Sequence, residues 1–117
     1  MQNYKDLKVW EKLPRFTLRV YEITKNFLKE EMYSLTNQIR RSSSSIPANI
    51  AEGCGKNTQG EFAHFLNIAL GSANESEYYV ILSKDLNYLK EEYFNELIAL
   101  INEIKAMLIN LISKVGA

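Results

Sequence analysis

Apolar side chains recur at three- and four-residue intervals along most of the chain, which is the spacing of residues on one face of an α-helix. Polar and glycine-containing stretches interrupt this pattern three times. The pattern therefore predicts four helices in a single domain spanning residues 1–117, at about 4–26, 34–53, 58–89 and 92–115. Since short connections join antiparallel neighbours, we expect an all-α, antiparallel four-helix bundle.

Helix-breaking and helix-capping residues add local detail. Thr58 and Glu61 fit a capping box, in which each side chain bonds the backbone N–H of the other residue at the start of a helix. Pro14 lies inside the first predicted helix and should bend it, at a cost of roughly 3 kcal/mol unless packing compensates. Pro47 removes the backbone donor for the carbonyl of Ser43, which serine hydroxyls or water could replace.

A carboxylate interrupts the apolar line that we expect to face the core in the third helix. Glu75 falls among Phe65, Ile68, Ser72, Tyr79, Leu82 and Leu86. A carboxylate in such a place needs a cation or several donors. Arg40 and Arg41 are the candidates, so the pattern favours a structural ion pair with one of them over a catalytic role for Glu75.

The fourth predicted helix is apolar nearly all round. Its core stripe accounts for Phe94, Leu97, Ile101, Ile104, Leu108, Leu111 and Val115. Further apolar positions lie outside that stripe, at Ile98, Leu100, Met107, Ile109 and Ile112. A helix of this kind is buried on more than one side. We interpret the surplus as a subunit interface, with a wide intramolecular core as the alternative.

Charge is balanced overall but unevenly distributed. The chain has 14 Lys and Arg against 14 Asp and Glu, which does not describe a strongly basic nucleic-acid binder. Five cations of the first helix nevertheless share one narrow sector: Lys5, Lys8, Lys12, Arg15 and Arg19. This basic stripe could follow a phosphate backbone, with Arg40 and Arg41 as further contacts. The alternative is an ordinary solvated helix face.

Candidate catalytic chemistry is sparse. His64 and Cys54 are the single histidine and the single cysteine, so no nucleophile–base pair or metal cluster of familiar spacing can be assembled. No phosphate-binding glycine loop, membrane-spanning run or signal sequence is recognisable. We therefore expect a cytoplasmic protein that is not an enzyme and needs neither a cofactor nor a metal.

Four strings carry a family resemblance over nearly the whole chain. They are LKVW at residues 7–10, YSLTNQIRR at 33–41, SIPANIAEG at 45–53 and FLNIALGS at 65–72. Together they resemble the bacterial 23S rRNA-intervening-sequence proteins. The resemblance implies an up-down-up-down, left-handed bundle that assembles as a ring-shaped homopentamer. It also implies RNA, DNA or an enzyme acting on nucleic acid as partners, because a related accessory protein of diversity-generating retroelements binds a reverse transcriptase and nucleic acid.

Two functional hypotheses follow. The first is a homo-oligomeric, pentameric helical scaffold with weak RNA or DNA binding through the basic stripe. The second is a protein-interaction adaptor with no role in nucleic-acid binding. The neutral charge of the chain departs from the markedly basic retroelement relative, which argues against strong nucleic-acid binding.

Overall fold

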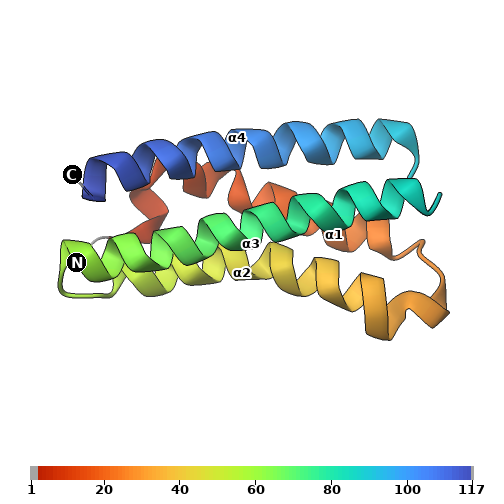
Figure 1. The fold of residues 1–117 in the computed structure, drawn as a ribbon, viewed down its shortest axis with the longest axis horizontal. Coiled ribbons are helices and arrows are strands. Elements are labelled where there is room, and N and C mark those ends of the chain that lie inside the picture. Colours follow the sequence, from red (N-terminus) through yellow and green to blue (C-terminus); the bar gives the residue numbers. More distant parts are fainter. Residues whose placement is uncertain (1–2, 117) are drawn as a thin grey trace.

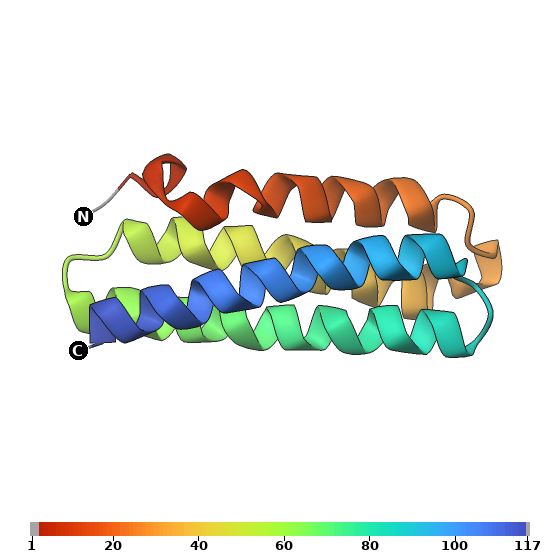
Figure 2. The same cartoon turned by 90° about the horizontal axis from the view of Figure 1, so that it is seen from above.

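Four α-helices lie side by side along the long axis of the computed structural model, which describes residues 3–116 (Figure 1). The described chain measures 43 × 24 × 19 Å. Successive helices run in opposite directions along that axis (Figure 2). The predicted all-α bundle of four helices is therefore confirmed. The helices are α1 (Leu13–Thr24), α2 (Asn37–Cys54), α3 (Gln59–Asp85) and α4 (Glu91–Gly116).

The first helix is shorter than predicted, because the region from residue 4 to residue 24 is divided. Two 3₁₀ helices, η1 (Tyr4–Asp6) and η2 (Lys8–Glu11), precede α1. Pro14 is the second residue of α1, where a backbone N–H has no partner within the helix in any case. The predicted bend at Pro14 is therefore wrong: the proline begins the helix instead of interrupting it.

The connection between α1 and α2 also contains short helical turns. A 3₁₀ turn, η3 (Lys29–Glu31), leads into a π-helical turn, η4 (Met32–Thr36), and regular α-helix begins only at Asn37. The predicted start at residue 34 falls inside the π turn. The Ser34 hydroxyl lies in this turn and contacts Glu31, so it does not cap α2.

The third helix ends four residues earlier than predicted. Asn87 has a positive φ of 64°, and its N–H bonds the carbonyl of Lys84 at 2.9 Å. The N–H of Tyr88 bonds the carbonyl of Ser83, also at 2.9 Å. These two bonds form a Schellman motif, which closes a helix through one left-handed residue. An asparagine tolerates that conformation better than most residues, so it can take the position usually held by glycine.

The start of α3 agrees with the sequence in part. The hydroxyl of Thr58 accepts the N–H of Glu61 at 3.1 Å, as the capping box requires. The carboxylate of Glu61 accepts from the Thr58 hydroxyl, at 3.1 Å, instead of from the backbone N–H. One half of the predicted reciprocal cap is therefore present.

Small side chains bring α2 and α3 close together. The buried inner face of α3 includes Ala69, Ala73 and Ser76, and the Ser76 hydroxyl lies 3.0 Å from that of Ser42 on α2. Gly53 closes the same contact, because a Cβ atom there would lie only 2.7 Å from the Cβ of Phe65. The serine-rich sequence of α2 thus supplies both short side chains and buried hydroxyls that have partners.

The carbonyl that Pro47 leaves without a backbone donor is bonded from a neighbouring helix. The Thr17 hydroxyl of α1 donates to the carbonyl of Ser43 at 3.3 Å. We expected serine hydroxyls or water in this role. The observed donor also ties α1 to α2 at the point where the proline interrupts the backbone hydrogen bonds of α2.

Candidate interface surfaces

The basic stripe of the sequence is partly neutralised by α4. Lys12 forms an ion pair with Glu103 at 3.3 Å. Arg19 donates two hydrogen bonds to Glu96, at 2.6 and 2.8 Å, and also contacts Glu22 at 3.3 Å. These two cations therefore lie at the boundary between α1 and α4 and not on a free face. The five cations therefore do not form one continuous solvated stripe.

The pair formed by Arg19 and Glu96 is a bidentate contact between α1 and α4. The bidentate hydrogen bond holds the pKa of the Glu96 carboxyl below its ordinary value, against the opposing effect of burial. The same bond raises the pKa of the Arg19 guanidinium. Both side chains stay charged over the whole neutral range, so Arg19 has its planar donor face occupied and is a poor candidate for binding a phosphate.

Three cations of the basic stripe remain exposed. Lys5 lies on η1, Lys8 on η2 and Arg15 on α1, and none of them forms an ion pair with a residue between 3 and 116. Because 3₁₀ helices turn by more per residue than α-helices, the even spacing expected for a single α-helix does not apply to Lys5 and Lys8. The stripe reduces to these three residues, which we call the free basic group.

Arg40 and Arg41 point to different partners. Arg41 forms an ion pair with Glu75 across the contact between α2 and α3. Arg40 instead donates to the Thr24 hydroxyl at 2.9 Å, and its guanidinium lies 4.9 Å from the centre of the Tyr21 ring. The arginine that meets the carboxylate is thus Arg41, and both arginines join α2 to a neighbouring helix.

The surplus apolar residues of α4 mostly pack within the chain. Leu100 is only 4% exposed and belongs to the core, so it is unavailable to a partner. Ile98, Met107 and Ile112 are half-buried and pack against that core. Met107 also lines a hollow of about 260 Å³ beneath the N-terminal segment, together with Leu7, Val9 and Leu111. Ile109, at 55% exposed, is the one residue of the predicted interface that stays open.

Two apolar residues that the sequence assigned to the core of the third helix, Ile68 and Leu86, are exposed. The buried face consists of Phe62, Leu66, Ala69, Ser72, Ala73, Ser76, Val80 and Ser83. Ile68, Tyr78 and Ile81 are exposed on the other side, and Leu86 is exposed just past the end of the helix. The predicted core line is therefore rotated relative to the true one. The inner face of α3 is marked by small residues such as alanine and serine. A search for large apolar side chains alone does not find it.

The candidate catalytic residues do not come together. His64 is exposed, and its ring meets the edge of Phe65. Cys54 is buried at the end of α2, and burial raises the pKa of its thiol, which disfavours the reactive thiolate. Between residues 3 and 116, no three His, Cys, Asp or Glu side chains gather in a way that could hold a metal ion.

None of the helices in that range is long and apolar enough to cross a membrane.

Comparisons with known proteins agree with one another on the family. The family model described as 23S rRNA-intervening sequence protein matches residues 5–110. A solved protein of unknown function from Bacteroides thetaiotaomicron VPI-5482, assigned to the S23 ribosomal protein family, is 33% identical. The match covers 90% of this chain and 95% of that one, with a TM-score of 0.83. Among curated proteins there is no match. The chain therefore belongs to the family of 23S rRNA-intervening sequence proteins.

Proposed function

We propose that this protein is a non-enzymatic, homo-oligomeric scaffold whose copies associate through the outer face of α3. The observation that carries the proposal is that α3 has apolar residues on both of its faces. Ile68, Tyr78 and Ile81 lie exposed opposite a fully formed core. A helix with two apolar faces is normally buried on both, and in this bundle only one of them is covered.

The exposed face has a regular spacing. At alternating intervals of three and four residues it presents His64, Asn67, Gly71, Asn74, Tyr78 and Ile81, which we call the outer α3 stripe. Every residue of the stripe is exposed, and none is Lys, Arg, Asp or Glu. This spacing places all six residues on one face of α3.

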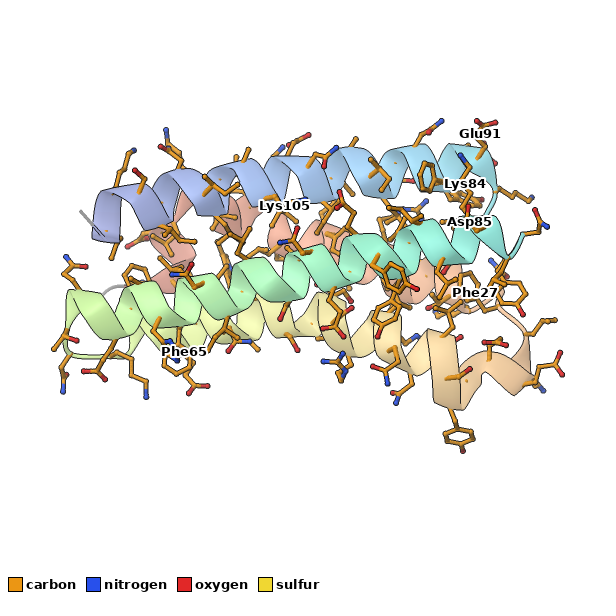
Figure 3. The ribbon with its side chains drawn as sticks, in the orientation of Figure 1. Phe27, Phe65, Lys84, Asp85, Glu91 and Lys105 are labelled. Carbon is orange, nitrogen blue, oxygen red and sulfur yellow. The ribbon has the colours of Figure 1, made fainter. Side chains whose placement is uncertain are left out.

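The charges beside the stripe are neutralised within the chain. Glu75 pairs with Arg41 on the side of α2, and Glu77 pairs at 3.1 Å with Lys105 of α4, which is labelled in Figure 3. Depletion of free charge is characteristic of the buried part of protein–protein interfaces. The resemblance to the family adds the expectation that the assembly is a pentamer.

Light scattering of the purified protein tests the proposal. We expect a molar mass that is a multiple of 13.5 kDa, five-fold for a pentamer. Ile81→Lys places a charge in the outer α3 stripe and should yield monomers that keep their helical circular dichroism. Tyr33→Lys is the matched control, because Tyr33 is 93% exposed and lies on η4, away from the stripe. A wild-type protein that is monomeric at all concentrations contradicts the proposal. The outer α3 stripe would then serve to bind a different protein, as in the adaptor hypothesis.

Weak binding of RNA or DNA is a second candidate function, supported by the free basic group. Lys5, Lys8 and Arg15 are exposed near one end of the bundle and lack an ion pair with the described residues. Three cations on each copy give little affinity alone, but repetition around an oligomer adds their contributions. This candidate therefore depends on assembly.

A further inference from the structure

A hollow of about 270 Å³ lies at the end of the bundle where α1 ends and α4 begins. Figure 3 labels Phe27, Asp85 and Glu91 at this end. We infer that the hollow, which we call the tyrosine pocket, binds a small molecule that carries a planar aromatic ring and a carboxylate group. The inference goes beyond the proposed self-association and does not depend on it. The residues that line the pocket come from three stretches of the chain: Ile23, Asn26, Tyr88, Lys90 and Tyr93.

Tyr88 is held in place by residues that do not line the pocket. Its hydroxyl donates to the carboxylate of Glu31 at 3.3 Å, and the centre of its ring lies 5.9 Å from that of Phe27. The backbone before it is closed by the left-handed residue Asn87. Because the hydroxyl, the ring and the backbone all have partners, the half-buried Tyr88 ring has little freedom to leave the wall of the pocket.

Tyr93 is supported by a different contact. The guanidinium of Arg19 lies 5.6 Å from the centre of its ring, and Arg19 is itself held by its two hydrogen bonds to Glu96. Such a contact is favourable because the negative face of an aromatic ring attracts a cation. The pocket therefore has two half-buried rings whose positions are set before any ligand arrives. Rings held in this way can pack against a planar ligand without losing conformational freedom on binding.

Lys90 determines which charge the ligand should carry. It is exposed, it is the one charged residue among the five that line the pocket, and it has no ion pair with a residue between 3 and 116. Tyrosine rings also attract organic cations. A cation here would meet the Lys90 ammonium, and the Tyr93 ring already has the Arg19 guanidinium over it. The pocket therefore favours an aromatic anion.

Asn26 and Ile23 complete the polar and apolar parts of the pocket. The backbone N–H of Asn26 bonds the carbonyl of Ile23 at 3.2 Å, which fixes the residue just beyond α1. Its exposed carboxamide can donate a hydrogen bond to an anion beside Lys90. Ile23 is 6% exposed and supplies an apolar surface.

The size and the donors of the pocket narrow the ligand further. Pockets for drug-sized molecules begin at roughly 300 Å³, so a volume of about 270 Å³ fits a ligand of one or two rings. A phosphate monoester carries nearly two charges and three acceptor oxygens. One ammonium and one carboxamide match the single charge and two oxygens of a carboxylate better.

A matched series of one-ring probes tests the inference by NMR titration of the full chain. Benzoate should bind saturably with a dissociation constant of about 1 mM, as expected for a ligand with so few atoms, and should shift the amide resonances of the residues that line the pocket. Cyclohexanecarboxylate lacks the aromatic ring, benzyl alcohol lacks the charge and benzylamine has the opposite charge, so each should bind several-fold more weakly. Absence of a saturable shift with benzoate, or equal binding of all four probes, overturns the inference.

Two substitutions separate the contributions of the charge and the ring. Lys90→Gln should weaken benzoate binding about threefold and leave benzyl alcohol unchanged. Tyr93→Leu should weaken both by about fivefold and reduce the preference for benzoate over cyclohexanecarboxylate. Lys29→Gln is the matched control, because Lys29 is an exposed residue of η3 that does not line the pocket. Circular dichroism confirms that each variant is folded. An equal loss of benzoate binding in the two lysine variants means that overall charge attracts benzoate, and it overturns the inference.

Adenosine monophosphate distinguishes a carboxylate ligand from a nucleotide. A sugar separates its ring from its phosphate, and the whole molecule exceeds the one or two rings that the pocket fits. We expect it to bind the pocket more weakly than benzoate does. Tighter binding at the same five residues would assign the pocket to a nucleotide and overturn the inference of a carboxylate.

Discussion

Gly53 and Gly60 differ in how tightly they are packed, so adding a methyl group at each should have different effects on stability. A Cβ at Gly53 would lie 2.7 Å from the Cβ of Phe65 and 3.2 Å from the ring of Phe62, whereas one at Gly60 would meet nothing within 4 Å. We expect Gly53→Ala to lower the free energy of unfolding by about 1–3 kcal/mol, because α2 and α3 must separate to admit it. Urea unfolding followed by circular dichroism measures this.

The matched control is Gly60→Ala. It should leave the unfolding midpoint unchanged or raise it slightly, since alanine favours the helix and restricts the unfolded chain. Equal midpoints for both variants would mean that Phe65 moves aside without cost and that the contact between α2 and α3 is looser than the structure indicates.

Glu96 makes the stability of the protein depend on pH. Its carboxyl pKa is lower in the folded chain than its ordinary value of 4.5, chiefly because of the hydrogen bond from Arg19. The stabilisation is therefore fully present above the unfolded-state pKa and is lost as the pH falls through the folded-state pKa. We expect Glu96→Gln to lose stability at neutral pH and to show a flatter decline below about pH 5. Glu92→Gln, which removes an exposed carboxylate of the same helix, should follow the wild-type curve.

The sequence indicated which charged residues form ion pairs more reliably than it indicated the residues they pair with. It proposed Glu75 as one member of an ion pair and offered two arginines, of which Arg41 is the one in contact. It placed Arg19 in a basic stripe that could follow a phosphate backbone, with a solvated helix face as the alternative, whereas Arg19 lies against Glu96. A residue at the border of two helices is neither on the buried face nor opposite it, so periodicity along one helix cannot show which neighbour it meets.

At the scale of the helix, apolar periodicity predicted the buried face correctly where only one face is apolar. It gave the wrong face where both faces carry apolar residues. The predicted core stripe of α4 corresponds to residues that are buried or half-buried. In α3, large apolar side chains lie on both faces, and the inner face is defined by Ala69, Ala73 and Ser76. Close approach of α2 favours small residues there, which moves the bulky ones outward. No sequence pattern predicted the π-helical turn η4.

The bond from Thr17 to Ser43 predicts how α2 accommodates its proline. We expect Thr17→Val to lower the free energy of unfolding by about 1 kcal/mol, because the carbonyl of Ser43 then loses its donor. In a Pro47→Ala background the backbone N–H of residue 47 can bond that carbonyl, and the cost of Thr17→Val should shrink. Chemical unfolding of the four proteins in a double-mutant cycle measures the coupling. A coupling energy of zero would assign the cost of Thr17→Val to lost packing alone.

At the scale of the molecule, the assembly decides where the remaining charge is displayed. In the proposed oligomer the outer face of α3 is covered by another copy, whereas the free basic group lies on η1, η2 and α1. The paired charges of α3 and α4 contribute little to the external field. Each copy of that proposed oligomer repeats the free basic group, and this repetition is how a chain of zero net charge can attract a polyanion.

This arrangement predicts weak, salt-sensitive nucleic-acid binding that depends on three residues. Replacing Lys5, Lys8 and Arg15 by Glu should abolish any mobility shift of RNA or DNA seen at low salt. Replacing Lys25, Lys29 and Lys90 by Glu changes the net charge equally at other exposed positions and should leave most of the shift. For the wild type, the logarithm of the binding constant should fall with the logarithm of salt concentration by about 2–3 for each engaged copy. If both triple variants lose binding to the same extent, overall charge is responsible and not the free basic group. If the wild-type protein gives no shift even at low salt, the oligomer is a scaffold without a nucleic-acid partner.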